Sequence, residues 1–466
     1  MLTVLEILII AAIIPVLVWA LLPVKKVPRF LDFMPAAAVI FMILHLFIDN
    51  EAVRFRFVPL YIFTIAVFLI TMKRIFRHEP NQPKHRVRAA FGRVAGLVAL
   101  ALAVLMPVVV LPFYPLPEPT GNFDVGTVVC DLTDKNRTEA FSTEAGAKRK
   151  IAVQFWYPAD STGATPEYDI DGAPVSASRG EYPVLIFSHG AFGMRMSNAS
   201  TYRELASHGY VVASIDHTYH SFFTSFADGS KVPVNMKFIN DAVGAQSGQM
   251  PADEVYKVSH EWLELRTADI ELLIDSLESG DIGDAGKILN GHMELNRIGL
   301  FGHSLGGAAS AQVGREREEV SAVIDIDGTM IGDITGLDAN GRDMVTEESY
   351  TKPVMMIYGS LFLDNEAKET SYLPNIHAYE NDTEAAYSLC VKDSGHLNFT
   401  DLPRISPFLS GMLGVGKIDS QQCLKIMNAY TLAFFDQYIK EQPSTLLEGE
   451  NVYPEAIFDR RIPAGK

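Results

Sequence analysis

The sequence contains little cysteine, with three residues in 466: Cys130, Cys390 and Cys423. Three scattered thiols exclude a disulfide-stabilised scaffold and a cysteine-based metal cluster. The sequence is compatible with a single disulfide bond outside the cytoplasm, and Cys390 and Cys423 are the favoured pair. Sequence alone does not place their Cα atoms within reach of each other. The chain also lacks internal repeats and low-complexity tracts, which excludes a repeat architecture.

Basic residues are scarce in most of the chain. Of its 39 Lys and Arg and 56 Asp and Glu, 12 basic and 5 acidic residues lie in residues 1–115, which leaves 27 and 51 for residues 116–466. The first part is therefore net +7 and the second net −24, a contrast hidden in the overall charge of −17. The acidic second part excludes nucleic acid as a partner, because neutralising phosphates requires clustered Lys and Arg.

Long apolar runs are confined to the first 115 residues. Each is close to the roughly 20 residues that cross the hydrocarbon core of a bilayer, and the runs lie near 3–22, 31–48, 57–72 and 94–112. They predict four transmembrane helices. The third run, which is short, and the first run, which contains Glu6 and Pro15, also suit a tilted or re-entrant segment. A cleaved signal peptide is the alternative for the first run, but no Lys or Arg precedes its apolar core and further spans follow.

Two ionisable residues, Glu6 and His45, lie within these runs. Such groups are costly in lipid and often mark a transport path. We favour a plainer interpretation, in which Glu6 reaches the interface by snorkelling and His45 makes a packing hydrogen bond between helices. The bundle is therefore predicted to be an anchor in the bilayer.

The short loops between the runs predict the orientation of the chain. Basic residues are concentrated at 25–29 and at 73–93, and cytoplasmic loops carry such an excess of Lys and Arg. The loop between the second and third runs has two arginines but also Asp49 and Glu51, so it fits the other side. Both termini then lie outside the cytoplasm, and we expect a multi-pass protein of the cell membrane with an extracytoplasmic catalytic domain.

A proline-rich stretch, Leu111–Gly121, is stiff and extended and marks the domain boundary. We predict a transmembrane region at 1–115, a linker at 116–124 and one catalytic domain at 125–466. Strand-like runs in this domain fall at Lys150–Tyr157, Tyr182–Ser188, Tyr210–Asp216, Arg297–Gly302, Ala322–Asp327, Pro353–Gly359 and Ala386–Val391.

Several of these runs are apolar throughout and are separated by helical segments. The best helical segments are Ala199–Ser207, Ala252–Ser279 and the residues after Ser304. This alternation predicts an α/β fold with a mostly parallel central sheet and helices on both faces, that is, an α/β-hydrolase fold preceded by an α-helical transmembrane bundle. The stretch Thr218–Pro251 is expected to be an insertion, either a lid over an apolar pocket or a surface excursion.

The run Asn296–Ala308 contains Gly-His-Ser-Leu-Gly after an apolar strand and before a helix, the context of a nucleophile elbow. In such a turn the glycines keep side chains away while the serine Oγ stands above the sheet edge. Ser304 is therefore the predicted nucleophile.

A serine nucleophile needs an imidazole base, and a third group must orient that imidazole. His396 follows the last predicted strand, where a loop at the carboxyl edge can reach the elbow, so it is the predicted base. Asp327 and Asp364 both preserve the order Ser, Asp, His. We favour Asp327 and keep Asp364 as the alternative acid, whereas Asp325 is expected to be structural.

The oxyanion hole requires two backbone N–H groups, one after the nucleophile and one from an early loop. Leu305 supplies the first. Ala191, in the Gly-containing turn Phe187–Gly193, is expected to supply the second.

Several segments, in this order, resemble one family, the platelet-activating factor acetylhydrolases: Ile151–Pro158, Phe187–Gly190, Leu205–Ala213, Gly302–Ala308 and His396–Asp401. The resemblance covers roughly residues 123–435. It implies a calcium-independent phospholipase with the α/β-hydrolase fold, in which Ser304 and His396 match the nucleophile and the base. Asp327 falls where the family carries its acid, and Ala191 and Leu305 match the oxyanion donors. The chain departs from the family in its membrane region and in Gly328–Ile331, which replaces an aromatic, proline-bearing stretch.

The sequence therefore predicts a membrane-anchored serine ester hydrolase that cleaves acyl esters of phospholipid or other lipid-like substrates and requires no metal or cofactor. Its expected partners are this ester substrate and the bilayer, and the sequence says nothing of the oligomeric state. An acyltransferase or general carboxylesterase on the same site, or a non-catalytic membrane receptor with a hydrolase-like domain, are the alternatives.

Overall fold

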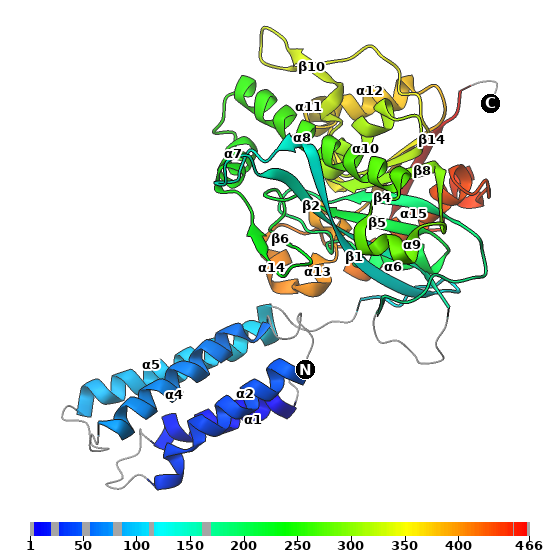
Figure 1. Ribbon diagram of the computed structural model, residues 1–466. Helices are drawn as coiled ribbons and strands as arrows, with labels where there is room; N and C mark the ends of the chain where they lie inside the picture. The colour runs from blue at the N-terminus through cyan, green and yellow to red at the C-terminus, as the bar shows by residue number, and fades with distance from the viewer. Residues whose placement is uncertain are drawn as a thin grey trace. The chain divides into compact units, whose positions relative to one another are not determined.

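The computed structural model describes most of the chain and separates it into two compact units (Figure 1). One unit comprises Met1–Pro115 with Pro403–Met412, and the other comprises Leu116–Leu402 with Leu413–Lys466. The residues that the structure describes are 4–19, 28–48, 56–77, 86–110, 116–160, 169–450 and 452–463.

The first unit is helical. Its main helices are α1 (Val4–Trp19), α2 (Met34–Ile48), α4 (Val58–Phe76) and α5 (Arg86–Leu105), and short helical turns lie at η1 (Arg29–Asp32) and η2 (Met106–Val110). Two segments, Arg29–Phe47 and Val58–Phe76, are long and apolar enough to cross a membrane, and the apolar parts of the outer two helices, Val4–Val18 and Val94–Val110, are shorter. The four apolar runs of the sequence therefore correspond to four helices, of which two satisfy the length of a span.

Three polar side chains meet in the core of this helical unit. The His45 ring contacts Glu6 Oε1 through Nε2 at 2.9 Å and the Tyr61 hydroxyl through Nδ1 at 2.6 Å. Glu6 and His45 are completely buried. The expectation that Glu6 snorkels to the interface is therefore wrong, because His45 offers it a partner inside the unit, whereas the expected packing hydrogen bond of His45 is present.

The second unit is built on a ten-stranded sheet in the order β14-β13-β12-β9-β8-β4-β5-β2-β1-β3. The six central strands from β13 to β5 are parallel, whereas β14 and β2 pair antiparallel with the two ends of this block, and β1 pairs antiparallel with β2. The strands of this sheet are β1 (Asp124–Thr138), β2 (Lys148–Ala159), β3 (Ile170–Asp171), β4 (Tyr182–Ser188), β5 (Val211–Asp216), β8 (Met293–His303), β9 (Val320–Ile326), β12 (Val354–Tyr358), β13 (Ala386–Val391) and β14 (Ala456–Arg461).

Helices cover both faces of the sheet (Figure 1). Side chains alternate between the faces of a strand, so Val184 and Ile186 of β4 join one apolar core with helices α8 (Ala252–Ser279) and α10 (Leu305–Glu316). Leu185 and Phe187 join a second core with α6 (Ala199–Ser207) and α15 (Ser420–Tyr438). The predicted α/β-hydrolase fold is confirmed.

Smaller elements fill the connections. They are two hairpins, β6 (Phe223–Ser225) with β7 (Lys231–Pro233) and β10 (Ile334–Leu337) with β11 (Asp343–Val345), the helices α7 (Met236–Gln246), α9 (Gly286–Leu289), α11 (Asn365–Thr370), α12 (Leu373–Asn381), α13 (Leu402–Ile405) and α14 (Pro407–Met412), and the turns η3 (Gly283–Ala285), η4 (Ile331–Asp333), η5 (Ser360–Leu363), η6 (His396–Phe399) and η7 (Thr445–Glu448). The first hairpin and α7 make up the predicted insertion.

All three cysteines are buried and free. The bridge considered between Cys390 and Cys423 is therefore absent from this structure. Cys390, at the end of β13, instead directs its thiol toward the carbonyl of Gly359 at 3.5 Å, and Cys423 is packed in the core on α15.

Candidate active site

The predicted nucleophile Ser304 lies between β8 and α10 with a backbone φ of 56° and ψ of −125°. A positive φ is unfavourable for a residue with a side chain and persists only where the surroundings impose it. Here the surroundings are glycines. A Cβ on Gly302 would stand 2.3 Å from the Gly306 backbone, and one on Gly307 would stand 1.9 Å from Asp325 Oδ1. The sharp turn between strand and helix therefore depends on these positions having no side chain.

The turn after β4 packs directly on this elbow. A Cβ on Gly306 would meet the Ser188 carbonyl oxygen at 2.0 Å, and a Cβ on Gly190 would stand 3.2 Å from Ser304 Cβ. The backbone around Gly190 thus lies beside the nucleophile, as the predicted oxyanion loop requires.

The predicted base and acid are in direct contact. His396 opens η6 after β13, and its Nδ1 lies 2.7 Å from Asp327 Oδ2. Because an ionised carboxylate can only accept, Nδ1 carries the proton and donates it, which leaves Nε2 free to act as a base. The His396 side chain is 47% exposed and that of Asp327 is 5% exposed, so the imidazole faces solvent while its partner is held inside.

His396 is also fixed next to the elbow through the residue before the nucleophile. The His303 ring lies 4.4 Å from the His396 ring between centroids, and His303 Nε2 donates to the His396 carbonyl oxygen at 2.9 Å. Burial, reinforced by the neighbouring His396, lowers the pKa of His303 to about 3. His303 is therefore a neutral packing and hydrogen-bonding residue.

Asp327 follows β9 on a left-handed backbone with φ of 52°. Its second oxygen, Oδ1, accepts from the Gly359 N–H at 2.8 Å and from the Tyr372 hydroxyl at 3.2 Å. Burial alone would raise the pKa of Asp327, but the hydrogen bond and charge of His396 and the Gly359 N–H hold it below its usual value. The carboxylate therefore stays ionised beside the imidazole.

The other two carboxylates considered from the sequence lie in different environments. Asp364 accepts from the Ala367 N–H at 3.0 Å as the N-cap of α11, a structural use of its side chain. Asp325 is buried beneath Asp327 and accepts from Asn375 Nδ2 at 2.9 Å and from the Gly328 N–H at 3.1 Å. The contact with His396 is made by Asp327.

Behind the β4 turn lies a buried chain of polar side chains. His217 Nε2 lies 2.9 Å from Ser188 Oγ, and His217 Nδ1 lies 3.0 Å from Asp269 Oδ2. Arg149 donates to both oxygens of Asp269 at 3.0 and 2.5 Å. Burial lowers the pKa of His217 to about 4, so the ring is neutral: Nδ1–H donates to Asp269 and Nε2 accepts from the serine hydroxyl.

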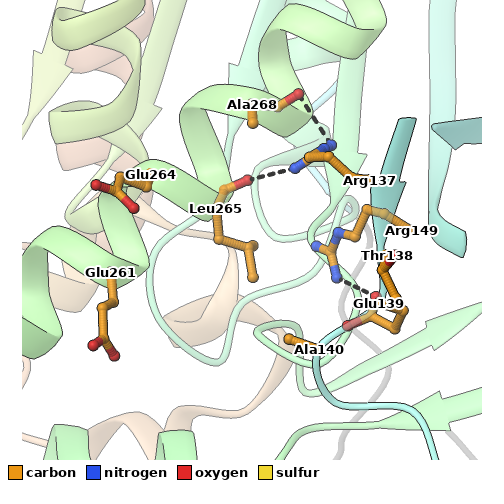
Figure 2. Close-up of a pocket in the computed structure, with 9 residues that line it drawn as sticks. All are labelled: Arg137, Thr138, Glu139, Ala140, Arg149, Glu261, Glu264, Leu265 and Ala268. Carbon is orange, nitrogen blue, oxygen red and sulfur yellow. Dashed lines mark hydrogen bonds and ion pairs between the residues drawn. The ribbon is translucent and has the colours of Figure 1, made fainter. Parts of the chain in front are cut away.

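A cavity of about 330 Å³ lies next to this series of hydrogen-bonded side chains, between α8 and the ends of β1 and β2. Figure 2 shows Arg137 directed at α8 carbonyls and Arg149 directed at Glu139, with Glu261 and Glu264 turned away from both arginines. The two arginines are already paired with carboxylates of the protein, including Asp269 and Glu139. Ser304, Asp327 and His396 are not among its lining residues, so this cavity is separate from the candidate site.

Sequence reasoning missed the residues that hold the candidate site from outside it. Tyr372 and Gly359 support Asp327, and Arg149 and Asp269 support His217. Nothing local distinguishes Tyr372, Asp269 or Arg149, which lies between Lys148 and Lys150.

Comparison with known proteins points to one family. A family model described as platelet-activating factor acetylhydrolase, isoform II, matches residues 161–448. The platelet-activating factor acetylhydrolase of Cavia porcellus is 27% identical over 301 residues, which cover 59% of this chain and 63% of that protein. The chain thus spans less than two thirds of that relative.

A fungal relative aligns over more of its length. The probable 1-alkyl-2-acetylglycerophosphocholine esterase of Arthroderma benhamiae is 23% identical over 421 residues, covering 78% of this chain and 98% of that protein. Among solved structures, a ferulic acid esterase from Streptomyces cinnamoneus is similar with a TM-score of 0.57 and 24% identity, covering 74% of this chain and 98% of that one. The structural likeness supports the fold.

Proposed function

The chain belongs to the platelet-activating factor acetylhydrolase family, and from this premise we propose that its second unit is a serine hydrolase of carboxylic esters, acting on acyl esters of phospholipid or other lipid-like substrates. The observation that carries the proposal is the 2.7 Å contact between His396 and Asp327, together with the strained backbone of Ser304 on the elbow. Acyl transfer through serine needs an imidazole oriented in this way within reach of the nucleophile, and His396 is linked to the elbow through His303, the residue before Ser304.

In the proposed mechanism, Ser304 Oγ attacks the ester carbonyl while His396 Nε2 accepts its proton. Asp327 stabilises the imidazolium that forms, and the N–H groups of Leu305 and Ala191 bind the developing oxyanion. His396 then gives the proton to the leaving alcohol. Water, activated by the same imidazole, releases the acyl group as a free acid and restores the serine.

The substrate class rests on the relatives. Two of them are named for acetylhydrolase or acetylglycerophosphocholine esterase activity. We therefore propose a short acyl chain on a glycerophospholipid or similar lipid as the group that Ser304 accepts. Release of free acid, with no transfer of the acyl group to added alcohol, would favour hydrolysis over acyl transfer.

The first unit is proposed to tether the hydrolase to a membrane, with the catalytic unit outside the cytoplasm. This proposal is supported by the two helices that are long and apolar enough to span and by the concentration of Lys and Arg in two of the loops. A tether of this kind keeps the enzyme at the surface where lipid esters are found.

Replacement of the nucleophile tests the proposed function. Ser304→Ala is expected to lower the hydrolysis of 4-nitrophenyl acetate by at least about 10³-fold without changing the unfolding temperature, because the hydroxyl that forms the acyl enzyme is gone. A fluorophosphonate probe should label the unaltered protein and fail to label this variant.

The matched control is Ser279→Ala, at the exposed end of α8, which should retain both hydrolysis and labelling. Turnover that survives Ser304→Ala at the original rate would refute the assignment of the nucleophile and with it the proposed mechanism.

A further inference from the structure

Helix α8 supplies a buried arginine to the turn that carries the proposed oxyanion donor. Arg266 is completely buried, and its Nη1 donates to the His189 carbonyl oxygen. Its Nη2 donates to the next carbonyl oxygen, that of Gly190, at 3.4 Å. One planar guanidinium therefore grips two successive peptide groups, a task that suits its fixed fork of donors.

The geometry of the peptide bond connects this grip to the active site. The C=O of Gly190 and the N–H of Ala191 belong to one planar trans peptide group and point in opposite directions. The Gly190 oxygen also accepts from His189 Nδ1 at 2.6 Å and from the Gly193 N–H at 3.1 Å. Holding this oxygen on the α8 side therefore directs the Ala191 N–H to the opposite side. In the described part of the chain no acceptor is recorded for that N–H.

The same turn is held at two further points. Asp269, one helical turn beyond Arg266, orients His217, which in turn accepts from Ser188 Oγ. On the other side, the Ser188 and His189 carbonyl oxygens lie so close to Gly306 that a Cβ there would meet them at 2.0 and 2.7 Å. The turn is thus clamped between α8 and the nucleophile elbow.

The energetic cost of Arg266 argues for a role beyond packing. Burying a charged guanidinium costs several kcal/mol, and an apolar side chain of similar volume often gives equal or greater stability. Its hydrogen-bond partners are neutral carbonyls, and its Nε has no hydrogen-bond partner among the described residues. Burial lowers the pKa of Arg266 to about 9, and the negative charge of Asp269 opposes this shift only in part.

We propose that Arg266 is a positioning residue for the oxyanion hole: by holding the His189 and Gly190 carbonyls, it aims the Ala191 N–H at the tetrahedral intermediate formed on Ser304. The inference rests on the proposed function, since it needs an ester substrate that passes through such an intermediate. Arg266 touches no reacting atom and acts through the Gly190–Ala191 peptide group.

Kinetics of the full-length protein with Arg266→Met test the inference. Loss of a correctly aimed oxyanion donor weakens transition-state binding more than substrate binding. We expect kcat for 4-nitrophenyl acetate to fall on the order of 10- to 100-fold while KM changes by less than about threefold. The Ki of a trifluoromethyl ketone, which forms an oxyanion on the serine, should rise by the same factor as kcat/KM falls.

A second variant keeps the test independent of folding. Arg266→Lys retains the charge but not the planar fork, so it should fold and show an intermediate loss of both kcat and inhibitor affinity. The matched control is Arg315→Met, on α10, because Arg315 is a mostly buried arginine that grips Asp333 and the Ser349 carbonyl away from the turn. This control should lose stability and keep kcat and Ki.

Unchanged kcat and Ki in folded Arg266→Lys would overturn the inference, as would a fall in kcat with no rise in Ki. Absence of Ser304-dependent turnover in the unaltered protein is a different result, because it would refute the proposed function itself and the inference with it.

Discussion

At the scale of single residues, Asp327 uses both carboxylate oxygens. The Gly359 N–H and the Tyr372 hydroxyl hold Oδ1, so that Oδ2 meets His396 at 2.7 Å. Two functions are thereby joined in one side chain: it selects the tautomer of the imidazole and it supplies negative charge when the imidazole becomes protonated.

Asp327→Asn is expected to lower kcat for 4-nitrophenyl acetate on the order of 10⁴-fold, because an amide keeps the shape but no longer fixes the required tautomer. The KM should change little. Steady-state kinetics on the purified full-length protein measure both.

Asp364→Asn is the control for this change, since Asp364 caps α11 and asparagine caps a helix equally well. Its kcat should match the unaltered protein. A large loss in this variant, with none in Asp327→Asn, would move the proposed acid to Asp364.

The sequence allowed prediction of Ser304, Asp327 and His396 as candidates because each follows a strand and the order of the three residues is informative. It did not allow prediction of Tyr372 or Arg266. Tyr372, at the start of α12, contacts Asp327, which lies 45 residues earlier in the chain. Arg266, on α8, contacts His189, which lies 77 residues earlier. Such pairings follow from the packing of helices on the sheet, which no local pattern encodes.

At the scale of elements, the elbow between β8 and α10 is a close approach of strand, helix and neighbouring turn. The backbones of Gly302 and Gly306 are in contact where a side chain would otherwise stand, and Ser188 closes the other side. The geometry of this element is thus determined by the absence of side chains.

Gly302→Ala is expected to destabilise the second unit by about 3 kcal/mol, because the added methyl group meets backbone atoms that cannot rotate away. Gly180→Ala is the control, since a Cβ there meets nothing within 4 Å. Denaturant unfolding followed by tryptophan fluorescence compares the two variants, and equal stability would contradict the close packing of the elbow.

Strands and helices with a clear apolar pattern were predictable, and the long strand β1, near one end of the sheet, was not. The bounds of β4, β13, α6 and α8 agree with the sequence prediction. By contrast β1 was missed, because its strand alternates apolar residues with glycine, aspartate and asparagine, which disfavour strands in isolation. Its antiparallel pairing with β2 overrides that local preference.

At the scale of the whole molecule, two units of opposite net charge are joined in one chain. The basic residues of the helical unit are concentrated in two short loops, which the positive-inside rule favours on the cytoplasmic side. We therefore propose a topology in which the second unit lies outside the cytoplasm.

Labelling of single introduced cysteines in intact cells tests this topology. Because the three native thiols are buried, a membrane-impermeant maleimide should react at Lys287→Cys, a site 78% exposed in the catalytic unit. Lys84→Cys, in the basic segment 73–93, should react after permeabilisation of the membrane and not before. The reverse pattern would place the catalytic unit in the cytoplasm.

Away from the candidate site, a second set of serine, histidine and aspartate is joined by hydrogen bonds, Ser188–His217–Asp269, and all three side chains are completely buried. This second set has the three residue types and the hydrogen bonds of a catalytic triad. Because it is completely buried, an ester cannot reach it. Its serine hydroxyl is already committed to His217, and its backbone has none of the strain found at Ser304. If the proposed function holds, access and backbone conformation rather than the identity of the three residues decide which serine reacts, and a serine-directed reagent should label Ser304 and not Ser188.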